Sequence, residues 1–598
     1  MSQLRNPCKD SLAEDIKSAF SKMGVKFEEA FPGTEPVSMQ IADTLEKPPE
    51  PHPGDYAFPC FRLAKVLKKA PPAIATELVT LLNQGRKPGS WFKEAIAVGP
   101  FANFLIDKTV LAKVLLPKVC DGTYRGELKA DVSRSSVRVM VEYSQPNTHK
   151  EFHVGHVRNV ALGGALCELF KYAGYQVVAA NYIGDEGTHI AKCLWHIQKK
   201  GLKAPEEKKG EWLGDMYAEA TRTLANASEE DRKLMDQEVS QVLREIESKR
   251  GPIYDEWKKT RQWSLDDFNA NYAWLGIAFD HFFYESEFTE EGQLLVDEYQ
   301  KLGFFKEDQG AIGIDLSPYK LGFMIVRKRD GNILYATRDL ALARKKFNDF
   351  KIDRSIVVVA CEQNHHFKQV FKTLELMGFP QAKSCYHLSY GMVVLPEGKM
   401  SSRAGNSVTF NTLRTEMLSE LHQYLEKYKD EWTPQEIEET AHRLCQGAIK
   451  YGMLYCDANR EIVFDLKNWL SFEGNTGPYL MYSSTRTQSI LRKAEEQGSH
   501  ESFTHLDLLA EESEHELLRY LFDFNEIALQ AAELYKPSLL TNHLFYMCKS
   551  FNRFYTDVPV LKASSEELLG ARLALISAFS SVLKTGLSLL GIIPPDKM

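Results

Sequence analysis

Apolar side chains recur at helical spacing near the start of the chain. Leu12, Ile16 and Phe20 lie four residues apart, which predicts an amphipathic helix. After a proline-rich loop, residues 96–107 predict a strand that a Gly-Pro turn interrupts. These elements indicate that residues 1–115 form a small α+β domain.

A strand–helix–strand pattern begins at residue 136. Residues 136–144 predict a strand, residues 154–174 a helix that ends at a glycine, and residues 175–185 a second strand. This order implies a right-handed crossover and a parallel sheet of the Rossmann type. Further strands, with helices between them, are predicted at residues 310–316, 322–328 and 355–361.

Helical patterns fill much of the remaining chain. A charged helical stretch within about residues 203–290 predicts an insertion with solvated faces. From about residue 410 the pattern is almost wholly helical, and Lys584 interrupts its apolar end, which predicts a buried helix and not a membrane span. The chain therefore divides into three predicted regions. They are residues 1–115, an α/β region at 116–410, and an all-α region at 411–598 whose last domain starts at about residue 470.

Composition and charge narrow the classes of protein. The 598 residues exceed what one hydrophobic core organises. The net charge of −8 disfavours wholesale coating of nucleic acid but allows a local basic groove. Ten cysteines without a Cys-x-x-Cys pair favour free thiols in a reducing compartment over structural zinc. The N-terminal residues have no apolar core, so we expect a cytoplasmic protein with no membrane segment. Because the cysteines are scattered, we also expect no structural metal.

The segment His153-Val154-Gly155-His156 follows the first predicted strand of the parallel sheet. Ligands of such sheets bind at the carboxyl ends of the strands, where the next helix offers free N–H groups. Gly155 would let a flat group such as a purine approach the backbone, and the imidazoles of His153 and His156 could donate to phosphate oxygens. The alternative is a surface turn with incidental histidines.

A second polar segment, residues 397–406, has the sequence EGKMSSRAGN. Its hydroxyls and the Lys399 ammonium could close over a polyphosphate and neutralise charge on departing pyrophosphate. The alternative is a solvated basic loop.

Together the two segments resemble the nucleotide-binding motifs of class I aminoacyl-tRNA synthetases. The second motif usually reads Lys-Met-Ser-Lys-Ser, so Ser402 and Arg403 depart from it while Lys399 is kept. The resemblance implies that ATP binds here with Mg²⁺, and that His153, His156 and Lys399 are catalytic. The implied ATP-binding residues are His153, Gly155, His156, Lys399, Ser401 and Ser402.

Further segments resemble the arginyl-tRNA synthetases within that class. The similar segments are residues 141–156, 334–343, 361–379 and 570–598, and the N-terminal region also fits this family. Gln145 stands where the family usually has serine, and Glu186 where it mostly has tryptophan. The resemblance implies a site for L-arginine. Its implied residues are Glu142, Gln145, Pro146, Asn147, His156, Tyr335, Asp339 and Gln363.

The chemistry of a guanidinium agrees with part of this set. A guanidinium is best recognised by carboxylates in planar, bidentate geometry. Glu142 ends a strand, and Asp339 shares a helical face with Tyr335. By resemblance these three hold the guanidinium, and others hold the α-amino and carboxylate end. Two alternatives stay open: a strand-end salt bridge for Glu142, and a pairing of Asp339 with Arg338 or Arg344.

The helical segment from about residue 470 resembles the anticodon-binding bundle of the family. Tyr482 and Arg486 lie one turn apart, so they could stack on an unpaired base and hold its phosphate. The resemblance implies tRNA contacts by Tyr482, Arg486, Tyr555 and the final Met598, and contact of the N-terminal domain with the tRNA elbow. Phe551 and Phe554 are further candidates, although most aromatic residues of a bundle lie in its core.

The resemblance implies a fold and a reaction. The fold is a multidomain α/β protein with a Rossmann-type catalytic domain, a helical insertion, a small N-terminal domain and a C-terminal helical bundle. The reaction forms arginyl-adenylate from ATP and L-arginine and then charges tRNA(Arg), through positioning and charge stabilisation. We expect a monomer. The alternatives are another class I synthetase, a small nucleotidyltransferase, or a non-catalytic RNA-binding paralogue.

Overall fold

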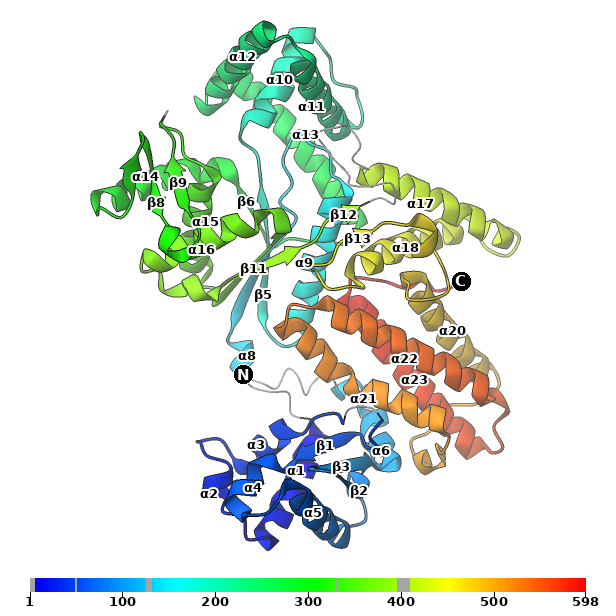
Figure 1. The fold of residues 1–598 in the computed structure, drawn as a ribbon. Coiled ribbons are helices and arrows are strands. Elements are labelled where there is room, and N and C mark those ends of the chain that lie inside the picture. Colours follow the sequence, from blue (N-terminus) through cyan, green and yellow to red (C-terminus); the bar gives the residue numbers. More distant parts are fainter. Residues whose placement is uncertain (1–5, 49–50, 125–131, 330, 395–408) are drawn as a thin grey trace. The chain divides into compact units, whose positions relative to one another are not determined.

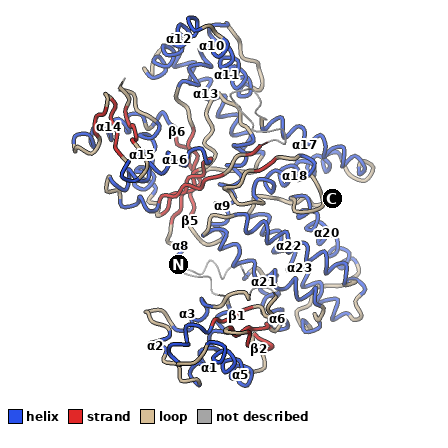
Figure 2. Tube along the Cα trace, in the orientation of Figure 1, coloured by secondary structure: helices blue, strands red, loops and turns tan. Residues whose placement is uncertain are grey.

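A computed structural model describes residues 6–48, 51–124, 132–329, 331–394 and 409–598 (Figures 1 and 2). The chain forms two compact units, each built from separate segments. The first contains Met1–Asp131, Arg486–Ile527 and Tyr546–Leu583. The second contains Val132–Thr485, Ala528–Phe545 and Lys584–Met598.

The N-terminal domain belongs to the first unit and is an α+β fold, as predicted. Its three-stranded antiparallel sheet has the order β1-β3-β2, and the Gly-Pro turn joins β2 to β3. The apolar face of α1 is fully buried. The elements are α1 (Pro7–Lys22), α2 (Phe27–Ala30), α3 (Val37–Thr44), β1 (Tyr56–Pro59), α4 (Ala64–Leu67), α5 (Pro71–Gly85), β2 (Phe92–Val98), β3 (Phe101–Ile106) and α6 (Lys108–Cys120).

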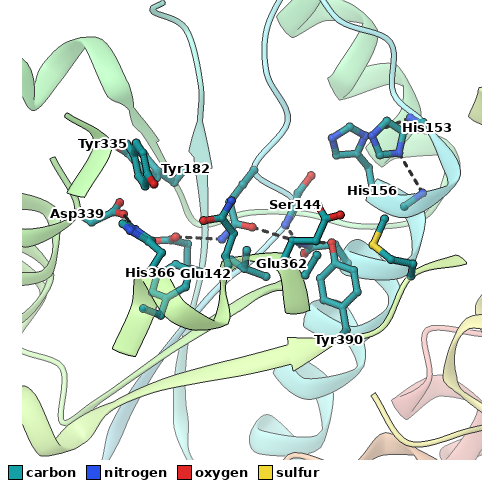
Figure 3. A pocket seen from close by; sticks show the side chains of 18 of the residues that line it. Glu142, Ser144, His153, His156, Tyr182, Tyr335, Asp339, Glu362, His366 and Tyr390 are labelled. Atoms are coloured by element: carbon teal, nitrogen blue, oxygen red, sulfur yellow. Dashed lines mark hydrogen bonds and ion pairs between the residues drawn. The ribbon is translucent and has the colours of Figure 1, made fainter. Parts of the chain in front are cut away.

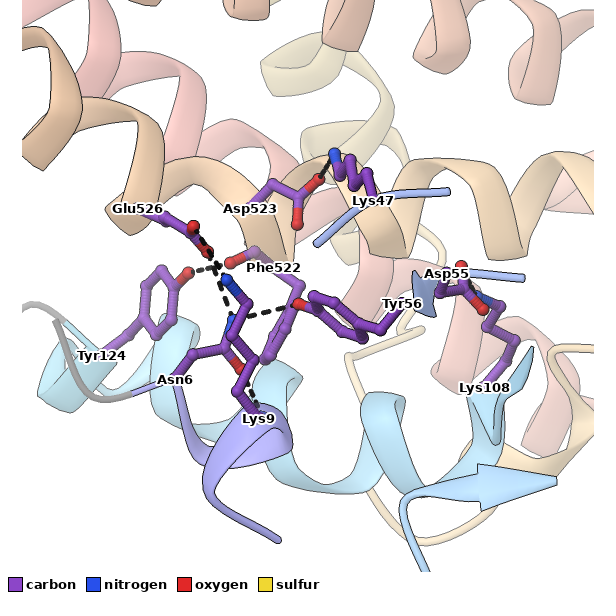
Figure 4. A network of polar contacts seen from close by, with 10 residues as sticks. All are labelled: Asn6, Lys9, Lys47, Asp55, Tyr56, Lys108, Tyr124, Phe522, Asp523 and Glu526. Carbon is purple, nitrogen blue, oxygen red and sulfur yellow. Dashed lines mark hydrogen bonds and ion pairs between the residues drawn. The ribbon is translucent and has the colours of Figure 1, made fainter. Parts of the chain in front are cut away.

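Polar contacts connect this domain to helix α21 (Glu512–Glu533) within the first unit (Figure 4). Lys9 pairs with Glu526 at 3.4 Å, and Lys47 with Asp523 at 2.7 Å. The Tyr124 hydroxyl donates to the carbonyl oxygen of Phe522 at 2.7 Å. The domain therefore packs on a segment about 400 residues distant in sequence.

The second unit is centred on a five-stranded, all-parallel sheet with the order β11-β10-β4-β5-β6. The predicted strand–helix–strand unit is confirmed as β4, α9 and β5. Strands after β4 extend first to one side and then to the other, so the strand order reverses between β4 and β10. Such a switch point opens a crevice at the carboxyl ends of the strands. The bounds are β4 (Arg138–Glu142), α9 (Val154–Tyr172), β5 (Gln176–Ile183), β6 (His281–Tyr284), β10 (Arg354–Ala360) and β11 (Cys385–Tyr390).

A separate antiparallel sheet corrects one prediction. Strands β7 (Lys306–Asp308), β8 (Ala311–Asp315) and β9 (Phe323–Arg327) pair in sequence order. A single 3₁₀ turn, Ser317–Tyr319, joins β8 to β9, so the helix predicted between these strands is wrong. The physical reason is the length of the connection, because a parallel crossover needs a dozen or more residues whereas an antiparallel hairpin needs only a few.

Helices fill most of the predicted insertion at about residues 203–290, but its first helix begins earlier than expected, and β6, a strand of the central sheet, lies within those bounds. The insertion has its own hydrophobic core, which includes Leu213, Val239 and Trp257. Its helices are α10 (Thr188–Lys200), α11 (Lys209–Asn226), α12 (Glu229–Glu247) and α13 (Pro252–Trp274). Further along the chain, α14 (Thr289–Lys301) precedes β7, α15 (Tyr335–Phe350) precedes β10, and α16 (Asn364–Leu376) precedes β11.

From residue 410 the chain is helical as predicted, apart from one short strand. β13 (Ile462–Val463) pairs in parallel with β12 (Val393–Val394). The helices are α17 (Phe410–Leu425), α18 (Pro434–Leu454), α19 (Leu466–Trp469), α20 (Gly477–Glu496), α21, α22 (Pro537–Asp557) and α23 (Glu566–Leu589). Among the described residues, α23 alone is long and apolar enough to span a membrane, and 67% of its apolar window is buried inside the structure. This burial is typical of a core helix.

Two aromatic candidates for RNA contact belong to the hydrophobic core. Phe551 and Phe554 are fully buried, and the Phe551 ring stacks on Phe579 at 4.2 Å. RNA contact by these two rings is therefore wrong. Tyr555 is 42% exposed, and the guanidinium carbon of Arg486 lies over its ring, 5.5 Å from the ring centroid. Tyr482 is also partly exposed.

Candidate active site

A cavity of about 470 Å³ opens at the carboxyl ends of the parallel strands. Strands β4, β5, β6 and β10 each contribute a lining residue at or beside their last position. Figure 3 shows His153 and His156 toward one end of the cavity, and Asp339, Tyr335 and Tyr182 toward the other. Its polar lining residues include Glu142, Ser144, Gln145, His153, His156, Asn159, Tyr182, Glu285, Tyr335, Asp339, Glu362, Gln363, His366 and Tyr390.

The two imidazoles of the first motif cap the N-terminus of α9. Nδ1 of His153 accepts the Gly155 N–H at 3.1 Å, and Nδ1 of His156 accepts the His153 N–H at 3.1 Å. A Cβ at position 155 would lie only 2.9 Å from Cε1 of His153, so glycine is needed for this cap. Because each Nδ1 is an acceptor, each neutral ring carries its proton on Nε2 and can donate it to a ligand.

The local environment keeps both rings neutral. Burial, together with the charge of Lys150, lowers the pKa of His153 to about 4. Burial, His153 and Lys150 lower the pKa of His156 well below its usual value. Neutral rings act here as hydrogen-bond donors rather than as cations.

His149, four residues before His153, has a different role. His149 is buried, and its Nε2 lies 2.8 Å from the hydroxyl oxygen of Thr260. Burial lowers the pKa of His149 to about 3. It does not line the cavity. His149 therefore belongs to the packing between this segment and α13.

The loop after β4 has a strained backbone. Ser144 and Gln145 have φ angles of 80° and 45°, in the left-handed region that side chains disfavour. The side-chain oxygen of Asn159 accepts the Ser144 N–H at 2.6 Å, and that of Asn181 accepts the Gln145 N–H at 3.1 Å. Two buried amides from α9 and β5 thus hold the loop in a shape that local sequence patterns do not predict.

Glu142 carries an ion pair that the sequence left as an alternative. Its carboxylate contacts the ammonium of Lys346, and both side chains are buried. The Gln145 side chain donates to the other carboxylate oxygen at 3.0 Å. Glu142 therefore lines the cavity with its charge already balanced by the protein.

Asp339, unlike Glu142, forms no ion pair with a lysine or arginine among the described residues. Its carboxylate accepts a hydrogen bond from Nε2 of His366 at 2.6 Å, and the His366 ring lies 4.5 Å from that of Tyr335. Arg338 pairs with Glu186, and Arg344 with Glu298. The alternative in which Asp339 pairs with one of these arginines is therefore wrong, and its carboxylate remains available to the cavity.

A second acidic residue of the cavity was missed by the sequence analysis. Glu285 directly follows β6 and lines the cavity, and no cation among the described residues forms an ion pair with it. Burial, with the nearby charges of Asp339, Asp185 and Glu186, raises the pKa of Glu285 to about 7, although Arg338 opposes the shift. The Tyr182 hydroxyl, also in the cavity, is buried without a hydrogen-bond partner among the described residues.

Glu285 was not predicted as a site residue because residues 281–284 were assigned to the helical insertion. A short apolar run followed by a carboxylate, as at the end of β4, was the available signal.

The other predicted site residues divide into three groups. Gln363 lines the cavity. Pro146 and Asn147 are not among its lining residues, and Asn147 forms an isolated bridge with Gly184. Lys399, Ser401, Ser402 and Arg403 lie outside the described residues. The described residues also contain no group of three His, Cys, Asp or Glu side chains placed to hold a metal.

Comparison with known families defines the class of this site. Residues 124–466 match the family model described as tRNA synthetases class I (R), catalytic domain. Residues 480–598 match a DALR anticodon binding domain, and residues 10–106 match the arginyl tRNA synthetase N terminal domain. The parallel sheet and its histidine-capped helix are thus those of a class I tRNA synthetase.

Relatives that match over almost their whole length identify the family within this class. The arginine–tRNA ligase of Bdellovibrio bacteriovorus is 41% identical over 573 residues, covering 95% of this chain and 96% of the relative. That of Clostridium perfringens is 36% identical over 562 residues, covering 93% and 96%. Thermus thermophilus arginyl-tRNA synthetase superposes with a TM-score of 0.78 at 28% identity, covering 98% and 99%. The chain belongs to the arginyl-tRNA synthetase family.

Proposed function

We propose that this protein is an arginine–tRNA ligase. It activates L-arginine with ATP to form arginyl-adenylate and pyrophosphate, and then transfers arginine to the 3′ end of tRNA(Arg). The observation that carries this proposal is a pair of carboxylates, Asp339 and Glu285, that form no ion pair with a lysine or arginine of the described residues, in a cavity that also contains His153 and His156. A cationic amino acid and a nucleotide would each meet complementary groups there.

At the nucleotide end, the adenine ring approaches the backbone at Gly155. The Nε2–H groups of His153 and His156 donate to phosphate oxygens as charge builds on the α-phosphate. Lys399, Ser401 and Ser402 neutralise and hold the departing pyrophosphate. The reaction needs no covalent enzyme intermediate, because the substrate carboxylate attacks the phosphorus directly.

At the amino acid end, Asp339 and Glu285 accept hydrogen bonds from the guanidinium. That end is completed by the exposed ring of Tyr335 and by the Tyr182 hydroxyl, which has no hydrogen-bond partner among the described residues. The balanced Glu142–Lys346 pair forms a polar wall rather than a second charge for the substrate. Asn147, His156 and Gln363 hold the α-amino and carboxylate end of the amino acid, and Gln145 and Pro146 also belong to the arginine site.

The remaining proposals concern partners and location. ATP binds as its Mg²⁺ complex. Tyr482, Arg486, Tyr555 and Met598 contact tRNA, with Arg486 already stacked over Tyr555. The protein acts in the cytoplasm as a monomer without a membrane.

Charging of total tRNA with each amino acid in turn tests the function. Arginine alone should become attached, and a non-catalytic paralogue would charge none. Pyrophosphate exchange, measured with and without tRNA, then shows whether adenylate formation requires tRNA. Attachment of a different amino acid would overturn the arginine assignment while leaving the synthetase class in place.

A further inference from the structure

Glu186 forms a closed cluster with Thr289 and Arg338 beside the carboxylate end of the cavity. Its Oε2 accepts the Thr289 hydroxyl at 2.8 Å and pairs with NH2 of Arg338 at 3.1 Å. Nε of Arg338 donates to the Thr289 hydroxyl at 3.2 Å. Each member thus contacts the other two. The Glu186 and Arg338 side chains are only 11% and 17% exposed, so solvent screens this pair weakly.

Arg338 lies next to both carboxylates that are proposed to bind the substrate. It immediately precedes Asp339 in the first turn of α15, and its charge reaches Glu285, whose pKa it lowers. Its side chain also carries a guanidinium, the same group that the proposed substrate presents. Carboxylates placed to bind one guanidinium in planar geometry suit another equally well. A tethered group has a high effective concentration, so a released Arg338 would be an effective competitor.

We propose that Glu186 is a positioning residue that holds Arg338 away from Asp339 and Glu285, and so keeps these carboxylates free for substrate arginine. This inference rests on the proposed function, because it concerns competition at the same guanidinium site. Glu186 acts through Arg338 and does not touch the substrate. It is a specificity device of this chain, which has glutamate where the family pattern mostly has tryptophan.

The residue before Glu186 has a parallel arrangement. Asp185 pairs with Nε of Arg261 at 2.8 Å, and it also accepts the Ser286 N–H at 2.9 Å. Two consecutive acidic residues of the β5–α10 loop therefore each hold an arginine of the protein. Since Ser286 follows Glu285, Asp185 additionally fixes the turn that presents Glu285. Within the described part of the chain, the Glu186 carboxylate accepts hydrogen bonds from side chains only, so its electrostatic role can be separated by mutation.

The test compares variants in arginine-dependent pyrophosphate exchange with tRNA present. Glu186→Ala should raise the KM for arginine roughly tenfold, the change for about 1.4 kcal/mol of competition. The KM for ATP should not change. Glu186→Gln keeps a hydrogen-bond acceptor but removes the charge, so its KM should lie between those of the wild type and Glu186→Ala. It also serves in place of Glu186→Ala if that variant does not fold.

A double variant separates competition from a scaffolding role. Glu186→Ala combined with Arg338→Met removes both the holder and the competitor, so the arginine KM should return to within about threefold of the wild type. If Glu186 merely supports the fold, the double variant will be as impaired as the single one, and the inference is overturned. Melting temperatures of all variants identify any loss that is due to unfolding.

The matched control is another ion pair of α15, Arg344 with Glu298. Glu298→Ala breaks the pair with Arg344, at 3.6 Å on a more exposed part of the helix, and should leave the arginine KM unchanged. If the wild type charges arginine but Glu186→Ala keeps the wild-type KM, this inference fails and the proposed function stands. If the wild type does not charge arginine, the proposed function itself fails.

Discussion

The histidine end and the carboxylate end of the cavity differ in how their chemical groups become available. The rings of His153 and His156 accept backbone N–H groups that lie within the same four residues. This local cap leaves the Nε2–H group of each ring free to donate to a ligand. Asp339 and Glu285 are available only because other elements hold the nearby arginines. A short motif can therefore encode the first kind of site, whereas the second depends on contacts between distant segments.

The same contrast separates Asp339 from Glu142. Both are acidic, both line the cavity, and both were predicted to hold a guanidinium. Lys346 from α15 neutralises Glu142, whereas the partner of Asp339 is an imidazole. Residue type and position along a strand or helix did not distinguish them. Their different partners did.

The largest expected effect comes from Asp339→Asn. This change keeps the shape, removes the charge and presents an amide N–H₂ to a group that only donates. We expect a loss of about 2–5 kcal/mol in transition-state binding of arginine, as for a broken desolvated charge pair. Arginine KM and kcat in pyrophosphate exchange measure it. ATP binding without arginine and the melting temperature should barely change, and an unchanged arginine KM would remove Asp339 from the site.

At the histidine end, His153→Ala and His156→Ala should each slow adenylate formation by roughly 10²–10³, the cost of losing one preorganised donor. His156→Ala should also weaken arginine binding. Single-turnover adenylate formation measures both. Near-normal activation by the double variant would contradict the assignment of these rings to the nucleotide.

A smaller effect concerns the proton on Glu285. Its pKa is raised to about 7, so the free carboxyl is neutral below that pH and charged above it. Arginine prefers the charged form, so the arginine KM should fall as pH rises from about 6 to about 8. Glu285→Gln should raise this KM roughly tenfold at the upper pH and flatten the profile. A profile that Glu285→Gln leaves unchanged would assign the titration to another group.

The smallest effect on catalysis is expected from His149→Ala. His149 is buried against Thr260 and does not line the cavity, so its loss removes one buried hydrogen bond, while the Thr260 hydroxyl keeps its bonds to the carbonyl oxygens of Glu256 and Trp257. The free energy of unfolding should fall by about 0.5–1.5 kcal/mol. The rate of adenylate formation at saturating substrate should stay within about threefold of the wild type. A loss of activity as large as that of His153→Ala would show that the two histidines act together.

The sequence alone determined the features that depend on local pattern. Hydrophobic periodicity predicted α1, the β4–α9–β5 unit, the helical insertion and the helical C-terminal region, because each pattern needs only neighbouring residues. The His153–His156 cap has the same local origin. The final apolar segment was correctly predicted as buried, since Lys584 and its serines are poorly suited to lipid.

Tertiary structure alone decided which charges are free. The sequence could not show that Lys346 lies against Glu142, that Glu186 holds Arg338, or that Glu285 joins Asp339 across the sheet. The two ion pairs, Glu142–Lys346 and Glu186–Arg338, come from segments more than 100 residues apart. Such partners meet only when the strand order brings their elements together. Because burial strengthens the interaction between charges while raising the cost of leaving one unpaired, the fold decides which carboxylates remain for a ligand.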